Sequence, residues 1–178
     1  MLTKNWYNHT AAALTGVTIT GGLKDYKGTT RDAVYQTAGS ASYLNFNKLS
    51  PFYAVNKGSL ITTKSDNVGY MFGDNATPAS MDDYTVVGNI VTGITVSKTV
   101  TGSADDSGVS LTTVFTIANE NDTDITIAEV CLFNKCDIAN ASQVCCCIDR
   151  TVLDSPITIM PDHAGQITYT IRMNYPTA

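Results

Sequence analysis

Polar and apolar residues alternate most regularly in the last third of the chain. In residues 166–173 the apolar side chains occupy every second position, so a strand would point all of them to one face. A second apolar-rich stretch, residues 150–159, precedes it across the turn-like residues 160–165, a layout typical of a β-sandwich. Similar patterns predict further strands at 94–100, 109–117 and 125–133, with polar turns at 102–108 and 119–124.

Turn signals every eight to twelve residues between alternating strands are typical of a β-sandwich. We therefore expect a mainly β fold, an immunoglobulin-like or Greek-key antiparallel β-sandwich. Residues 17–80 are rich in Gly, Ser, Thr and Asn and carry weaker signals. Brief strands are expected there and just beyond, at 17–19, 32–36, 42–46, 59–63, 70–72, 84–87 and 89–93.

Residues 3–15 predict a short N-terminal helix, with Thr3 as its cap and Gly16 as its stop. Trp6, Ala13 and Leu14 fall on one helical face, with Tyr7 beside them. The helix either covers one end of the sandwich or forms an arm that docks on a neighbouring subunit.

If the helix is an arm, Leu2, Trp6 and Tyr7 are the expected contact residues, since aromatic side chains dominate interface energetics. The expected domains are the arm at 1–16 and a single sandwich domain at 17–178. Residues 17–68 could form a looser β region packed on 69–178.

Charge is scarce: 15% of residues are charged and 43% are hydrophobic, where ordinary globular chains carry roughly a quarter charged residues. Threonine fills much of the gap. This composition favours a surface covered by neighbouring subunits over that of a Thr-rich soluble monomer. With a net charge of −5 and a pI of 4.7 the chain lacks the basic stripe that nucleic-acid binding requires. No apolar stretch approaches the ~20 residues that span a bilayer, and the N-terminus does not resemble a secretion signal.

The five cysteines are Cys131, Cys136, Cys145, Cys146 and Cys147. They contain no Cys-x-x-Cys pair, and three adjacent strand residues cannot converge on one ion, so no metal site is expected. No base accompanies them either, which argues against a catalytic thiol. We expect Cys146 to pack as a small core residue and one of its neighbours to lie near Cys131 or Cys136. Which cysteines, if any, form disulfides stays open.

Glu129 falls on the apolar face of the expected strand 125–133, where a lone carboxylate would be costly to bury. It therefore requires either a bulge or a partner cation, and Arg150 is the candidate. We predict a structural Glu129–Arg150 ion pair that fixes strand register. Asp82 and Asp83 are read as a turn or cap. No residue set suggests catalysis or a bound cofactor, so an enzyme is not expected.

Several motifs resemble those of small virion proteins of tailed bacteriophages and prophages. They are LTKNWY at 2–7, GDNATP at 73–78 with DDYT at 82–85, AEVCLF at 128–133, RTVLDSP at 150–156 and GQITYTIRMNYP at 165–176. The chain departs from the family pattern at Cys131, where that pattern has glycine, and in its cysteine run.

This resemblance implies a structural virion protein, made in the host bacterial cytoplasm and assembled into the particle. Its expected partners are the major capsid protein or tail proteins, and further copies of itself. Capsid-exterior decoration is the first expectation, and a tail, neck or baseplate component is the alternative. A carbohydrate-binding or adhesion module is a third reading, based on Tyr26, Tyr35, Tyr43, Phe52 and Tyr53 in loop-like stretches.

Overall fold

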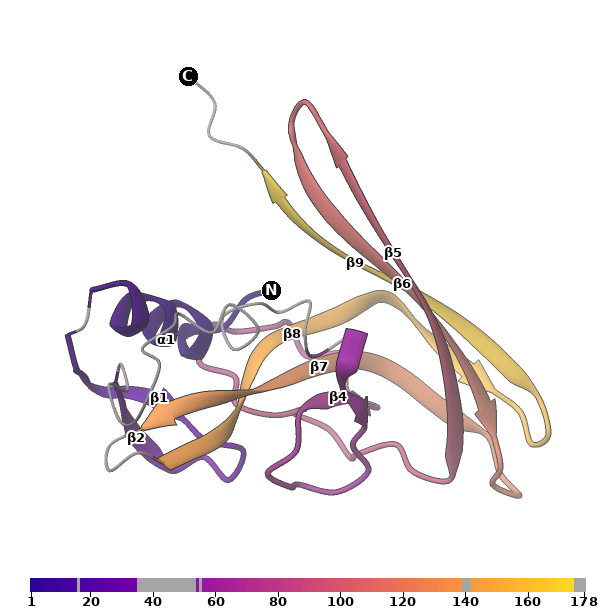
Figure 1. Ribbon diagram of the computed structural model, residues 1–178. Helices are drawn as coiled ribbons and strands as arrows, with labels where there is room; N and C mark the ends of the chain where they lie inside the picture. Colours follow the sequence, from indigo (N-terminus) through magenta and orange to yellow (C-terminus); the bar gives the residue numbers. More distant parts are fainter. Residues whose placement is uncertain (16, 35–53, 55, 139–141, 175–178) are drawn as a thin grey trace. The chain divides into compact units, whose positions relative to one another are not determined.

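The computed structural model describes residues 1–15, 17–34, 54, 56–138 and 142–174. Within these residues the fold is mainly β with a short N-terminal helix, consistent with a β-sandwich (Figure 1). That prediction is confirmed, and the immunoglobulin-like arrangement stays a prediction. The elements are α1 (Lys4–Thr15), β1 (Ile19–Lys24), β2 (Thr30–Ala33), β3 (Ser59–Leu60), β4 (Gly69–Gly73), β5 (Ile94–Asp105), β6 (Gly108–Asn119), β7 (Ile125–Ile138), β8 (Ser142–Ile159) and β9 (Ala164–Asn174).

The chain forms two compact units. The first comprises Met1–Val91 with Ile127–Pro156, and the second Thr92–Thr126 with Ile157–Ala178. The predicted boundary after residue 16 does not separate these units, because α1 packs against β1 within the first one. The single domain expected from residue 17 onward stays a prediction.

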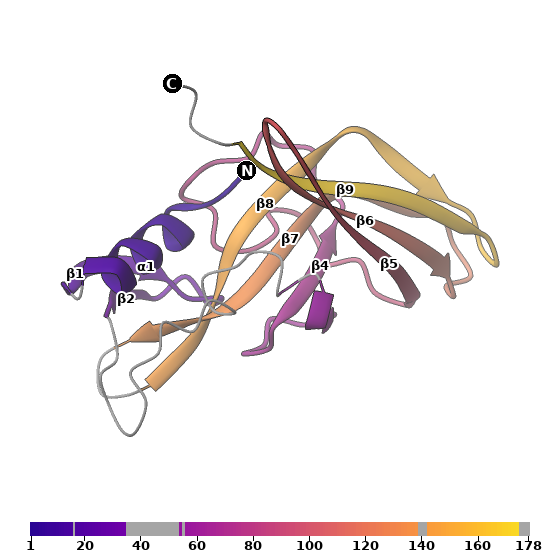
Figure 2. The same cartoon turned by 45° about the horizontal axis from the view of Figure 1, so that its top comes forward.

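In the first unit, strands follow the order β3-β4-β7-β8, and β1 pairs with β2 in a separate hairpin. β3 is parallel to β4, and β4 is antiparallel to β7. In two views β7 and β8 run side by side (Figures 1 and 2). A buried apolar cluster lies on this sheet: Ile61, Met71, Val86, Cys131, Phe133, Cys145 and Cys147.

Residues 1–3 pair with β8 before α1 begins. Leu2 forms a bridge with Asp149, and the Thr3 amide donates to the Ile148 carbonyl at 3.0 Å. The Thr3 carbonyl accepts the first helical amides, as expected of a cap residue. Thr3 thus occupies the predicted cap position, and its hydroxyl donates to the Cys147 carbonyl of β8 at 2.6 Å.

The buried face of α1 is Asn5, His9 and Ala12, whereas the apolar pattern suggested Trp6, Ala13 and Leu14. Leu14 is 65% exposed. The reason lies in what the helix packs on: the Asn5 amide bonds the backbone of Lys24 and the Cys147 carbonyl. Polar backbone groups at this interface select a polar helix face. Gly16, the expected stop, lies outside the described residues.

In the second unit, β6 is the central strand of the sheet β5-β6-β9, antiparallel to both neighbours. One face is apolar, as predicted for 109–117 and 166–173, and Phe115, Ile117 and Ile167 are buried on it. Thr113, which interrupts the apolar series, is also fully buried, and its hydroxyl has no hydrogen-bond partner.

Several strand boundaries differ from the predictions. β5 and β6 continue through most of the expected turn at 102–108, since Asp105 accepts the Ser107 and Gly108 amides and closes the hairpin there. Residues 84–87 and 89–93 do not form strands apart from a bridge at Ile90. Expected strand 42–46 and the end of 32–36 lie outside the described residues.

Candidate functional site

Arg150 is the largest fully buried side chain of the described residues, and it forms two ion pairs. Its Nε lies 2.5 Å from Oε2 of Glu129, which is also fully buried, and one terminal nitrogen lies 2.9 Å from Oδ2 of Asp83. We call these three residues the Arg150 cluster. The structure thus brings together the two residues expected to pair and adds Asp83, which was interpreted from the sequence as part of a turn or cap.

The Arg150 cluster also binds the backbone of the connection between β4 and β5. The guanidinium donates to the carbonyls of Thr77 at 2.9 Å and Pro78 at 3.4 Å. Glu129 in turn accepts the amides of Val87 at 3.1 Å and Gly88 at 2.9 Å. Residues 77–88 are therefore fixed at both ends by side chains of β7 and β8, and the amides at 87 and 88 are not free for strand pairing.

The close approach of Glu129 explains the glycine that ends β4. Gly73 pairs with Glu129 across the sheet. A Cβ at residue 73 would lie 2.4 Å from Glu129 Oε1, well inside contact distance. Only glycine lets the carboxylate turn along the sheet toward residues 87 and 88.

The electrostatics of the Arg150 cluster favour a structural role. Burial lowers the pKa of Arg150, but the hydrogen bonds and charges of Glu129 and Asp83 outweigh it and hold that pKa above its ordinary value. The guanidinium stays charged, and both carboxylates are occupied by donors. A buried ion pair of this kind fixes local geometry more than it adds stability.

The five cysteines are buried and unbridged. Burial, followed by hydrogen bonding to Cys147, raises the pKa of Cys131. Hydrogen bonding to Cys136, together with burial, raises the pKa of Cys146. Burial also raises the pKa of Cys145. Reactive thiols have lowered pKa values, so these thiols have the character of core residues.

The residues expected to form an interface have different surroundings. Tyr7 is 47% exposed, Trp6 is half-buried, and their rings meet edge to face with centroids 5.0 Å apart. Leu2 is half-buried and pairs with Asp149 through its backbone. Tyr7 is therefore the most accessible of the three, whereas Leu2 is part of the sheet edge. Their role at an interface stays a prediction.

The face of the β5-β6-β9 sheet opposite its apolar side is lined by hydroxyl groups. The strand registers place these side chains in rows, and neighbours bond across the strands: Ser103 to Ser110 at 2.8 Å and Thr112 to Thr170 at 3.2 Å. We call this surface the hydroxyl face. It consists of Ser97, Thr99, Thr101, Ser103, Ser110, Thr112, Val114, Thr116, Gln166, Thr168, Thr170 and Arg172.

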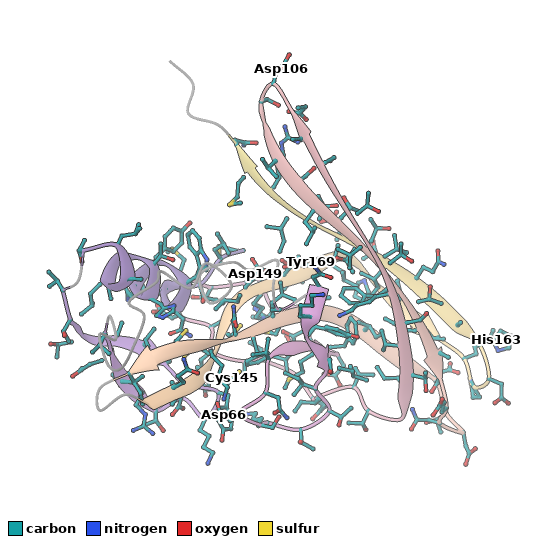
Figure 3. The ribbon with its side chains drawn as sticks, viewed as in Figure 1. Asp66, Asp106, Cys145, Asp149, His163 and Tyr169 are labelled. Atoms are coloured by element: carbon teal, nitrogen blue, oxygen red, sulfur yellow. The ribbon has the colours of Figure 1, made fainter. Side chains whose placement is uncertain are left out.

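Two charged residues stand at one end of the hydroxyl face: Arg172, and Asp105 two positions after Ser103. Arg172 pairs with Asp105 at 2.8 Å and bonds the Ser107 hydroxyl, next to the turn that carries Asp106 (Figure 3). These hydrogen bonds hold the pKa of Asp105 far below its ordinary value. This face was not predicted from the sequence, because the apolar residues defined the strands and the Thr and Ser residues between them were not assigned to one surface.

Other candidate groups are dispersed. His9 is buried in α1, and His163 lies exposed in the turn between β8 and β9 (Figure 3). The part of the chain that the structure describes holds no group of three or more His, Cys, Asp or Glu side chains arranged to bind a metal ion. None of its helices is long and apolar enough to cross a membrane.

Of the aromatic residues expected to stack sugars, Tyr26 is half-buried. Tyr35, Tyr43, Phe52 and Tyr53 lie outside the described residues. The chain matches no protein-family model, no curated protein and no solved structure.

Proposed function

We propose that this chain is a structural protein of a tailed-phage virion, carried on the capsid exterior and acting through contacts between subunits. The observation that supports this role best is the hydroxyl face. Burying an unpaired charge at an interface costs several kcal/mol. Removing one partner of a buried pair, for comparison, costs about 3–5 kcal/mol. Hydroxyls are cheaper to bury, because they exchange hydrogen bonds with a neighbour readily.

The motifs shared with small virion proteins provide the second line of support. They include the Glu129 and Arg150 motifs, AEVCLF and RTVLDSP. In the structure the same residues fix the β4–β5 connection, which contains the third motif, DDYT. Residues of these three motifs therefore bond one another within the first compact unit.

The first experiment is the copy number of the protein in purified particles, by quantitative mass spectrometry against the major capsid protein. A ratio near one, or within a few-fold of it, supports a decoration protein. A small fraction moves the proposal to the tail, neck or baseplate. Absence from particles refutes a virion role, and a positive glycan array would then favour the adhesion module.

A pair of variants tests the hydroxyl face itself. Thr170→Lys places a charge among the hydroxyls, whereas Thr123→Lys adds the same charge in the exposed turn before β7. We expect Thr170→Lys to lower incorporation into particles on the order of tenfold or more, with Thr123→Lys close to wild type. Equal incorporation of the two folded variants would show that this face is not the contact surface.

A further inference from the structure

Four of the five cysteines form two thiol pairs across β7 and β8. The Cys147 thiol donates a hydrogen bond to Cys131, with the two Sγ atoms 3.4 Å apart. Cys146 on β8 and Cys136 on β7 form the second pair, and interaction with the Cys136 thiol is the largest cause of the raised pKa of Cys146. All four side chains are fully buried, and β7 and β8 are hydrogen-bonded neighbours in the sheet.

The fifth cysteine stands apart from both pairs. The Cys145 thiol donates to the Asn67 carbonyl at 2.7 Å. Its backbone amide donates to the Asp66 carboxylate at 2.6 Å, and Figure 3 shows these two residues next to each other. Successive strand residues point to opposite faces, so Cys146 and Cys147 each face a different partner on β7. Alternation thus separates Cys146 from Cys147, whereas Cys145 shares the face of Cys131 and Cys147 and is held apart by its bonds to Asn67 and Asp66.

We propose that Cys131–Cys147 and Cys136–Cys146 are latent disulfide sites, closed by a small disulfide such as oxidised glutathione once the protein leaves a reducing compartment. The proposal does not rest on the proposed function. The two Sγ atoms of the first pair must approach by roughly 1.4 Å, since a disulfide bond measures about 2.0 Å.

The chemistry is ordinary thiol–disulfide exchange. One protein thiolate attacks oxidised glutathione, forming a mixed disulfide and releasing one glutathione thiolate. The neighbouring protein thiol then loses its proton and attacks the protein-side sulfur, which releases the second glutathione. Each bridge thus transfers two electrons from the protein sulfurs to one glutathione disulfide, and the two protons end on the two reduced glutathiones.

Burial controls when the bridges form. Exchange requires a thiolate and access for the oxidant, and the raised pKa values of Cys131 and Cys146 make the thiolate scarce in the closed sheet. Closure therefore requires a local opening of the β7–β8 pair, and its rate should rise with mild denaturant. Once formed, the same burial protects the bridges from reductants.

The test equilibrates the folded protein in oxidised glutathione, with and without sub-denaturing urea, and maps its peptides under non-reducing conditions. We expect bridges 131–147 and 136–146, with Cys145 as the one free thiol. The bridged protein should have a higher melting temperature than the same protein after it has been unfolded, treated with a reductant and refolded. The rate of closure should increase several-fold in the urea. Five free thiols at equilibrium, or any bridge to Cys145, would overturn the proposal.

Two variants make the pairing specific. Cys147→Ser should lose one bridge, leave Cys131 and Cys145 free, and retain 136–146. Cys145→Ser keeps a donor for the Asn67 carbonyl and serves as the matched control, with both bridges forming as in wild type. If Cys147→Ser does not fold, the peptide map of Cys145→Ser still decides the pairing, because a new partner for Cys131 there contradicts the proposal.

Discussion

Replacing Arg150 with methionine removes a buried charge while keeping an unbranched side chain of similar length. In the wild type the guanidinium bonds Glu129 at 2.5 Å, Asp83 at 2.9 Å and the Thr77 carbonyl at 2.9 Å. The variant leaves Glu129 buried, with only the backbone amides of the β4–β5 connection as donors. Removing one partner of a buried pair costs about 3–5 kcal/mol, or roughly 6–20 °C in melting temperature for a chain of this size.

The assay is urea unfolding followed by circular dichroism, with the double variant Glu129→Gln/Arg150→Met beside the two single variants. Each single variant leaves the other member of the pair buried without its partner. The loss of unfolding free energy in the double variant should therefore be at least about 1 kcal/mol smaller than the sum of the two single losses. Arg31→Met is the control. Its pair with Asp25 is 3.3 Å long and the arginine is 43% exposed, so its loss should stay below about 1 kcal/mol. An Arg150→Met loss no larger than that of Arg31→Met, or strict additivity, would refute the reasoning.

Three further predictions concern single positions. Gly73→Ala should cost about 1–3 kcal/mol in urea unfolding, because its Cβ meets Glu129. Gly102→Ala, whose Cβ has only Leu111 at 4.0 Å, should be near neutral, and equal effects would contradict the clash. Asp105 has a lowered folded pKa, so its stabilising contribution is present above its unfolded pKa of about 3.9 and is lost as the pH falls through the folded value. Carboxyl NMR titration should show that pKa rising toward normal in Arg172→Gln, and an unchanged value would exclude the pairing. Thr113→Val should stabilise the protein by about 1 kcal/mol by removing a buried hydroxyl without a partner. Thr112→Val removes a hydroxyl that bonds Thr170 and should give no gain in stability. A gain for Thr112→Val but not for Thr113→Val would contradict the assignment of the unpartnered hydroxyl to Thr113.

Sequence patterns located the features that depend on neighbouring residues. Period-two alternation identified β6, β9 and most of β7, and the placement of Glu129 on an apolar face was sufficient to expect a cation at Arg150. Asp83 was missed because its pairing depends on how the β4–β5 connection folds back, which no local pattern records.

Other features were misjudged because the determining partner is distant in sequence. The apolar residues of α1 suggested a buried face through Trp6 and Leu14. The helix instead lies on backbone carbonyls and amides, including those of Lys24 and Cys147, which bond Asn5. Residues 84–87 have strand-like composition, but Glu129 takes the amides at 87 and 88.

The pairing of residues 1–3 with β8 has a consequence for the order in which the protein can fold. Leu2 and Thr3 are synthesised well before their backbone partners, Ile148 and Asp149. Since α1 buries its polar face on groups that include the Cys147 carbonyl, it has no complete docking site until β8 has left the ribosome. Residues 1–3 must therefore stay unpaired until residues 148 and 149 have been made. Contacts of such long sequence separation slow folding, so the first unit should complete its fold only after β8 has been made.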